Sequence, residues 1–252
     1  FEKMLYDQAL MMMAYTEGWQ ATQNPLFKQT VYEIAEYVNR DLRSEAGYFY
    51  SAEDADSEGE EGKFYTWSHA ELTSSLPEEE MEFLEEYFNI SKEGNFNDEA
   101  TGAPTGQNIL WLDIPLGSAE TSRWHAIRAT LTSVRNTRIR PLLDDKMLTD
   151  WNALMISALA RSGAVFDESD FIQSAEKAYQ FVLHTMLENE VLYHRYRDDE
   201  RAIHAFADDY AFLIQASIDL YEATFNSEYL KQAVALNDHF IDRFYDAEVG
   251  GF

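Results

Sequence analysis

A chain of 252 residues, 46% of them hydrophobic, is long enough to bury a substantial core. Its 46 acidic residues against 19 Lys and Arg give a formal net charge of -27, which repels phosphate backbones and anionic membrane surfaces, so we expect no nucleic-acid or membrane partner. The absence of cysteine excludes a disulfide, a thiolate metal site and a cysteine nucleophile. No apolar run approaches the roughly 18 residues of a membrane span, and we expect a soluble, cytoplasmic protein.

Three stretches of the chain repeat one pattern, an apolar helix, a turn, a second helix and a strand. In all three stretches, the aromatic residue that opens the second helix lies 17 positions after an apolar residue of the first helix. The pairs are Leu10 with Phe27, Leu154 with Phe171, and Phe212 with Tyr229. Apolar residues recur with helical periodicity, so each helix buries one broad face, and we expect the first member of each pair to be buried. Such hairpins cover their apolar faces by stacking in a ring, which predicts an all-α fold, an α/α toroid of helical hairpins with short β-hairpins between them.

One less regular segment interrupts the repeat. Aromatic strands at residues 48–50 and 63–67 flank an acidic loop, and another hairpin begins at Val191. Residues 68–141 lack the repeat; one helix begins at Pro77, and a longer one is predicted from Thr121 to Ile139. We therefore expect one incomplete toroid domain over residues 1–252, with hairpins near 1–50, 149–193 and 207–252, cut at both ends from a longer protein.

The up-and-down order of the helices brings the segments before each first helix to the same end of the toroid, where acidic and aromatic residues gather. Aromatic rings stack on the apolar faces of sugars, and carboxylates bind sugar hydroxyls. The candidate catalytic residues are Asp54, Asp56, Asp145 and Asp209, and the candidate substrate-binding residues are Glu53, Tyr50, Trp67, Lys146, Trp151, Asn152 and Tyr210. Each acid also has a structural explanation, since acids at such positions cap helices or solvate turns. In the last repeat, Asp208 is the expected cap and Asp209 or Tyr210 the expected ligand contact.

Long motifs of the chain resemble the thioredoxin-domain-containing proteins related to spermatogenesis-associated protein 20. The matching stretches are Phe1–Asp7, Tyr48–Gly59, Asp144–Asn152, Asp208–Ala211 and Gly250–Phe252. Where the family motif usually has Gly after Trp-Asn, this chain has Ala153. The resemblance implies a six-hairpin toroid similar to N-acylglucosamine 2-epimerases and six-hairpin glycosidases. It also implies a fused thioredoxin-like domain outside this chain, as a partner of the toroid.

The residues leave several functions open. Glycoside hydrolysis needs two carboxyl groups a defined distance apart, whereas sugar epimerisation or isomerisation needs a base of near-neutral pKa, for which His194 and His204 are candidates. A lone histidine is more often structural. The run Asp54 to Gly59 is similar to half of a calcium loop, but Tyr65 stands where a bidentate Glu is needed, so no metal site and no cofactor are expected. The predicted function is acid-base chemistry on a sugar or glycan; the alternative is a non-catalytic scaffold or binding platform for the thioredoxin-like domain.

Overall fold

The computed structural model describes residues 1–98 and 101–252, which form two compact units. The larger unit comprises Lys3–Glu53 and Leu143–Phe252, and the smaller unit comprises Phe1–Glu2 and Asp54–Leu142. Each unit has its own hydrophobic core. None of the described helices combines the length and apolar character that a membrane span requires.

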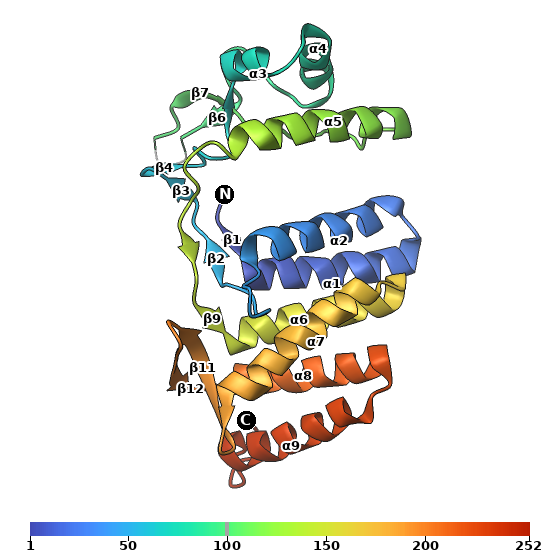
Figure 1. Cartoon of the computed structure of the whole chain (residues 1–252), viewed down its shortest axis with the longest axis vertical. Helices are drawn as coiled ribbons and strands as arrows, with labels where there is room; N and C mark the ends of the chain where they lie inside the picture. Colours follow the sequence, from blue (N-terminus) through green and yellow to red (C-terminus); the bar gives the residue numbers. More distant parts are fainter. Residues whose placement is uncertain (99–100) are drawn as a thin grey trace. The chain divides into compact units, whose positions relative to one another are not determined.

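The larger unit contains three helical hairpins (Figure 1). They pair α1 (Leu5–Thr22) with α2 (Pro25–Tyr37), α6 (Thr149–Phe166) with α7 (Ser169–Phe181), and α8 (Ala207–Thr224) with α9 (Ser227–Phe244). The first helix of every pair has 18 residues and ends at a residue in the left-handed conformation, Gln23, Asp167 or Phe225. Both α2 and α7 continue into a π-helical turn, η1 (Val38–Leu42) and η2 (Val182–Met186). The predicted all-α fold class is confirmed.

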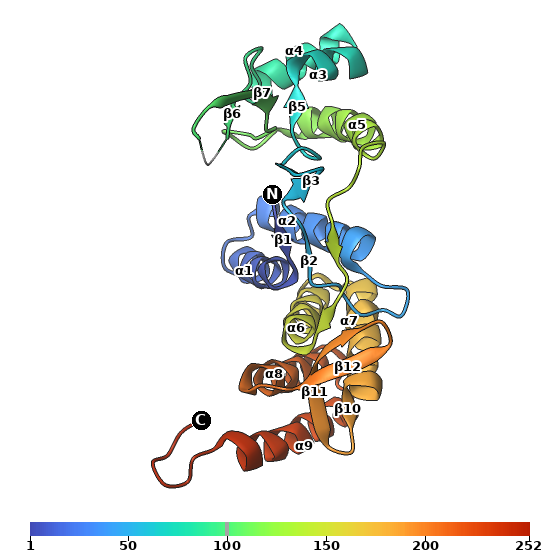
Figure 2. The same ribbon diagram turned by 90° about the vertical axis from the view of Figure 1, so that its left-hand side faces the viewer.

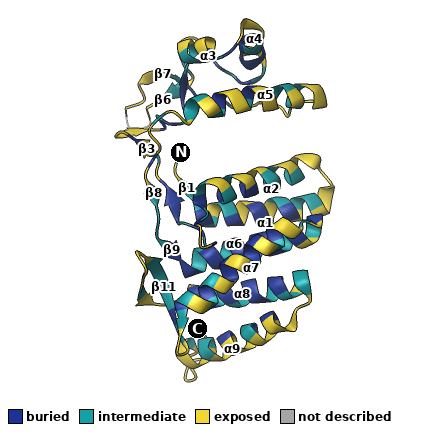
Figure 3. Cartoon of the chain, in the orientation of Figure 1, coloured by how far each residue is buried: buried dark blue, intermediate teal, exposed yellow. Residues whose placement is uncertain are grey.

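The first helices α1, α6 and α8 lie side by side, as the view along their axes shows (Figure 2). A buried hydrogen bond of 2.8 Å joins Thr16 Oγ1 of α1 to Ser162 Oγ of α6. Helix α6 also packs against α7, and residues on most of its faces are buried (Figure 3). The middle hairpin therefore forms the core of this unit.

The prediction that Leu10 is buried is wrong. Leu10 is 48% exposed, whereas Leu5, Ala9 and Met12 on the same helix are completely buried. These three residues follow the helical period, and Leu10 lies to one side of their stripe. Leu154 and Phe212, at the equivalent places of α6 and α8, are of intermediate exposure.

Strands lie at the end of the larger unit where its first helices begin (Figure 1). One sheet has the order β1–β2–β8, and in the other β11 pairs with β9, β10 and β12. The strands are β1 (Lys3–Met4), β2 (Ala52–Glu53), β8 (Leu143–Asp144), β9 (Met147–Leu148), β10 (Leu187–Glu188), β11 (Val191–Arg197) and β12 (Glu200–His204). Because β1 and β9 run directly into α1 and α6, and β12 ends just before α8, this end gathers side chains from all three hairpins.

The smaller unit packs three helices against short strands around a core that includes Leu72, Leu84 and Ile127. Its elements are β3 (Asp56–Ser57), β4 (Glu60–Glu61), β5 (Trp67–Ser68), α3 (His69–Ser75), α4 (Glu78–Tyr87), β6 (Phe96–Asn97), β7 (Pro104–Asn108) and α5 (Ser118–Arg135). Helix α5 begins and ends before the predicted limits of Thr121 and Ile139. Shortly after the helix ends, the Arg138 side chain donates to the backbone carbonyls of Lys63, Phe64 and Thr66.

Candidate functional site

Three titratable side chains meet at the strand end of the larger unit. His194 lies on β11, Asp150 in the first turn of α6, and Asp209 in the first turn of α8. Pairing of β9 with β11 and a 2.7 Å hydrogen bond from Thr149 Oγ1 to the Tyr193 carbonyl hold β11 beside the start of α6. One ligand-type atom from each of the three residues lies within 4.8 Å of the others.

Asp209 is completely buried and joins these segments. Its Oδ2 accepts from the Phe206 amide at 2.8 Å, and its Oδ1 from the Asp150 amide at 2.9 Å. Both oxygens lie 3.0 Å from Nδ1 of His194. The expectation that Asp208 caps this helix is wrong, because Asp209 makes the capping bond. These donors hold the Asp209 carboxylate between the starts of α6 and α8 and β11.

His194 is oriented by this carboxylate. Because Asp209 offers only acceptors, Nδ1 carries a proton, and no hydrogen bond to Nε2 is found within the described part of the chain. The hydrogen bond to Asp209 raises the pKa of His194 above 6.5, against the effect of burial and with help from the charges of Asp209 and Asp150. The side chain remains 17% exposed, and its ring meets the edge of Phe206 at 5.1 Å. His194 is therefore anchored through Nδ1.

Asp150 lies beside His194, with 4.0 Å between its Oδ1 and Nδ1 of the histidine. Burial raises the pKa of Asp150 to about 6, and the charge of Asp209 adds to this effect. Its Oδ1 accepts from the Trp151 amide at 2.8 Å, while its side chain stays 16% exposed. An acid with a pKa of about 6 is thus adjacent to a histidine whose pKa is raised.

The three side chains offer a donor set that a metal ion could use, so we tested whether they fit one. Both oxygens of Asp209 already accept N–H bonds, and the histidine nitrogen that faces the acids is protonated. A cation would have to displace that proton and compete with two backbone amides. The contacts fit a carboxylate-oriented histidine better than a metal centre.

An aromatic pair adjoins the site. The rings of Trp151 on α6 and Tyr6 on α1 lie 4.8 Å apart at 60°, and both are of intermediate exposure. Trp151 directly follows Asp150 in the first turn of α6, and Tyr6 lies in the first turn of α1.

Two other predicted site residues at this end form ion pairs. Asp145 Oδ1 lies 2.8 Å from Nε of Arg197, and Lys146 pairs with Asp144. All four side chains are partly exposed. They surround the strand end without joining the His194 cluster.

Glu53 and Tyr50 have neighbours within the protein. Glu53 is 2% exposed and accepts a 3.0 Å hydrogen bond from Tyr37 Oη. Tyr50 is partly buried, and its ring meets Tyr48 edge-on at 5.5 Å. Burial of Glu53 removes it from the surface that a ligand would meet.

Asn152 and Tyr210 are structural in this fold. Asn152 is completely buried; its Oδ1 accepts from the Phe49 amide at 2.8 Å, and its Nδ2 donates to the carbonyls of Phe49 and Leu148 at 2.9 and 3.0 Å. Tyr210 is 1% exposed, and its hydroxyl accepts from the Leu192 amide at 3.4 Å. Both side chains bridge backbone groups of distant segments, and their predicted role in substrate binding stays a prediction.

The remaining candidates, Asp54, Asp56 and Trp67, belong to the smaller unit. Asp54 is exposed and accepts from the Asp56 amide at 3.0 Å, in the chain that leads into the β3–β4 hairpin. A carboxylate that caps its own turn has a structural role. That Asp54 or Asp56 shares a concavity with the acids of the larger unit stays a prediction.

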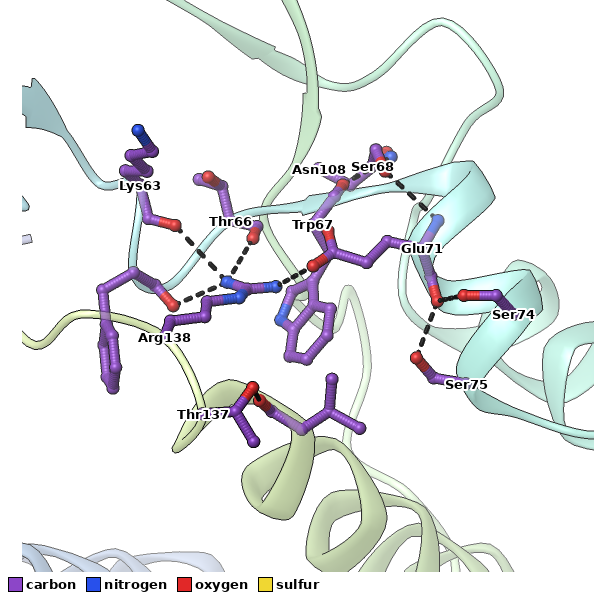
Figure 4. Close-up of polar contacts among 12 residues, drawn as sticks. Lys63, Thr66, Trp67, Ser68, Glu71, Ser74, Ser75, Asn108, Thr137 and Arg138 are labelled. Carbon is purple, nitrogen blue, oxygen red and sulfur yellow. Dashed lines mark hydrogen bonds and ion pairs between the residues drawn. The ribbon is translucent and has the colours of Figure 1, made fainter. Parts of the chain in front are cut away.

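Trp67 is 3% exposed, and its stacking partner is an arginine (Figure 4). The Arg138 guanidinium lies 4.0 Å from the ring centre. Its Nη1 donates to the carbonyls of Phe64 and Thr66 at 2.7 and 2.8 Å, and its Nη2 to Glu71 at 2.8 Å. Trp67 is thus a core residue of the smaller unit, covered by a fully engaged cation.

Sequence reasoning missed Asp150 and treated His194 as one open possibility. Asp150 is adjacent to a predicted residue, Trp151, but reads as an ordinary acid in a first turn. The pairing of β9 with β11 brings His194 to it, and such pairing of distant segments leaves no local signal. Asp209 was among the candidates because it stands at the start of the first helix of the last repeat, at the end where acidic and aromatic residues gather.

No protein-family model matches the chain. The chain is similar over its whole length to spermatogenesis-associated protein 20 of Homo sapiens, at 31% identity over 290 aligned residues, and spans 37% of that protein. The rat protein of the same name has the same identity and covered share. These findings confirm the resemblance carried by the motifs.

Solved structures show the fold at much lower identity. Cellobiose 2-epimerase from Bacillus thermoamylovorans superposes with a TM-score of 0.58 at 9% identity, over 98% of this chain and 46% of the epimerase. A mannosidase of glycoside hydrolase family 76 from Bacteroides thetaiotaomicron gives 0.55 at 8% identity, over 97% and 46% of the two chains. The chain thus has the α/α-toroid fold, which sugar-processing enzymes share.

Proposed function

We propose that this chain, a homologue of spermatogenesis-associated protein 20, is the part of a carbohydrate-active enzyme that epimerises or isomerises a sugar through His194 and Asp150. The observation that carries the proposal is the double contact of His194 Nδ1 with the buried Asp209 carboxylate. A carboxylate at one nitrogen fixes the tautomer and stabilises the imidazolium, which prepares the other nitrogen for proton transfer.

The pKa shifts of Asp150 and His194 support the roles of general base for Asp150 and general acid for His194. Above about pH 6 Asp150 is a carboxylate and accepts a proton, while the raised pKa of His194 keeps the imidazolium populated as the donor. In epimerisation or isomerisation, Asp150 removes the proton from a carbon next to the sugar carbonyl. His194 protonates the carbonyl oxygen, which gives the enediol. Asp150 then returns its proton to carbon, and the hydroxyl that becomes the carbonyl of the product returns a proton to His194, so both residues end in their starting states. Asp209 positions His194 throughout.

The substrate we propose is a neutral sugar. An overall charge of -27 disfavours anionic substrates, and the ring pair of Tyr6 and Trp151 offers an apolar stacking surface beside the acids. Lys146 and Asp145, at the same strand end, add polar groups that hydroxyls can bind.

Hydrolysis of a glycoside is the second candidate, because the raised pKa of Asp150 is typical of a group that exchanges protons near neutrality. A hydrolase needs two carboxyl groups that both reach the substrate, roughly 5 to 9.5 Å apart. Asp209, fully buried and hydrogen-bonded, does not meet this requirement. Asp54 or Asp56 would have to supply the second carboxyl group.

A non-catalytic scaffold for a thioredoxin-like domain is the third candidate. It is favoured by the number of predicted acids that are already engaged: Glu53 with Tyr37, Asp54 in its turn and Asp145 with Arg197. The desolvated pair of Asp150 and Asp209 argues against it, because a scaffold gains nothing from a buried like-charge pair.

Deuterium exchange distinguishes the three candidates. The full-length protein is incubated in deuterated water with a panel of neutral reducing sugars and disaccharides, and exchange at sugar carbons is followed by NMR. Epimerisation or isomerisation gives deuterium at the carbon next to the carbonyl, hydrolysis gives new reducing ends without carbon exchange, and a scaffold gives neither.

Asp150→Asn and His194→Gln should lower the exchange rate by about 10²- to 10⁴-fold, the usual contribution of general acid-base catalysis. Asp198→Asn, on the exposed turn after β11, is the matched control and should keep the rate. Exchange that persists in both site variants would remove these residues from the mechanism.

A further inference from the structure

A polar groove of about 630 Å³ lies between α2 and α7 in the larger unit, away from the His194 cluster. Residues of α2, η1 and α7 line it, among them Asn39, Arg43, Ser174 and Lys177. These two helices belong to successive hairpins and make few contacts with each other, which leaves room between them.

Two cations in this groove have only neutral partners. Arg43 Nη1 donates to Asn39 Oδ1 at 3.1 Å and to Ser174 Oγ at 2.8 Å, and Lys177 Nζ donates to the Glu45 carbonyl at 3.1 Å. Across residues 1–98 and 101–252, neither cation forms an ion pair. In a chain with 46 acidic residues and 19 Lys and Arg, two cations that line one groove are expected to pair with carboxylates, and these two do not.

Their presence is not explained by the repeat. Helix α7 and η2 match α2 and η1 in length and order, and there Leu183 and Leu187 occupy the places of Asn39 and Arg43. On α9, the place of Lys177 is taken by Ala235. The elements therefore form without Asn39 and Arg43, whereas the place of Lys177 varies, with Glu33 on α2 and Ala235 on α9.

The Arg43 side chain is fixed in place. Asn39 Nδ2 donates to the Ala35 carbonyl at 2.9 Å, and Ser174, 6% exposed, lies 3.4 Å from Asn39 Oδ1. These bonds use Nη1 alone; for Nη2 and Nε no hydrogen bond occurs among the residues described. A guanidinium held at one nitrogen keeps a two-nitrogen edge for a planar, charged partner.

We propose that this groove is a binding site for one oxyanion group, the phosphate or carboxylate of a small ligand, with Arg43 as the anchor and Lys177 as the second cation. Glu36 and Asp170 also line the groove, which excludes polyanions such as nucleic acid. The net charge of the protein does not prevent this binding, because solvent screens charges beyond about 8 Å at physiological salt. The site is independent of the proposed reaction.

Calorimetric titration at constant ionic strength tests the site with two probes, phenyl phosphate and benzoate, which share a ring and differ in the oxyanion. Saturable binding of either supports the proposal, and the tighter probe identifies the class of ligand. Arg43→Gln should weaken that binding by about 10- to 100-fold, the loss expected for hydrogen bonds to a charged group. Arg43→Lys keeps the charge without the fork and should bind with intermediate affinity.

Lys231→Gln is the control, because it removes one positive charge from an exposed place on α9. Its affinity should equal that of the unchanged protein. If Arg43→Gln does not fold, the same titration is done with Lys177→Gln and Arg43→Lys. The proposal is overturned if neither probe binds saturably, or if Lys231→Gln weakens binding as much as the groove variants.

Discussion

Burial of Asp150 makes its ionised form unfavourable in the folded protein. Its pKa is about 6 in the folded protein against an ordinary value of 3.8, so the neutral acid is favoured by the fold and the carboxylate is penalised. The stability that the folded protein gains from the neutral form of Asp150 is fully present below pH 3.8 and is lost as pH rises through about 6. At neutral pH the burial of Asp150 therefore lowers the stability of the folded protein.

Asp150→Asn should therefore raise the melting temperature at pH 7 to 8 and leave it nearly unchanged near pH 4, because the amide removes a charge that the fold disfavours only where Asp150 is ionised. Thermal unfolding across this pH range measures the difference. Asp198→Asn, which is exposed, should show no such dependence. A uniform loss of stability would contradict the raised pKa.

Turnover of the sugar substrate should follow a bell-shaped pH profile. The acid limb lies near pH 6, where Asp150 becomes a carboxylate, and the alkaline limb lies above 6.5, where His194 loses its proton. The measurement is kcat/KM as a function of pH. Asp209→Asn should move the alkaline limb to lower pH, because it removes the partner that raises the pKa of His194; an unmoved limb would assign it to another group.

Asn152 connects two elements that are far apart in the chain, the start of α6 and the strand residue Phe49. Asn152→Ala leaves the amide and the carbonyl of Phe49 without their side-chain partner in a buried place, which should cost about 3 kcal/mol of unfolding free energy. Urea denaturation measures this cost. Gln8→Ala, at the equivalent place of α1, should change stability by less than about 0.5 kcal/mol; similar costs for both would show that helix packing matters and not the bridge.

Helices were the elements most open to prediction, because their periodicity is local. The three hairpins and their turns follow from repeated spacings such as Leu154 to Phe171. The end of α5 at Arg135 does not follow from the local pattern, and the residues after it contact segments that are distant in the chain, as Arg138 does with Phe64 and Thr66. For the same reason the sequence points to Asp209, whose place recurs in the repeat, and gives no sign that His194 lies beside Asp150.

The charge of -27 acts on the whole molecule, since like charges repel most strongly in the compact state. Raising NaCl from about 0.02 to 0.3 M should screen this repulsion and raise the melting temperature by about 2 to 4 °C, the shift expected for roughly 1 kcal/mol in a chain of this size. Calorimetry measures the shift. A rise that levels off in this range fits screening; a fall would mean that attractive ion pairs outweigh repulsion.

The chain crosses between its two units next to the three strands of the sheet β1–β2–β8: before Lys3, after Glu53 and before Leu143. Glu53 pairs with Leu143 and Ala52 with Asp144, so the stretch from Asp54 to Leu142 leaves and returns through two adjacent antiparallel strands. A β-hairpin of two such strands needs only a two-residue turn to close. The smaller unit is therefore connected as an insertion in a hairpin loop, and a gene that lost or exchanged it would leave the order of the hairpins in the larger unit unbroken.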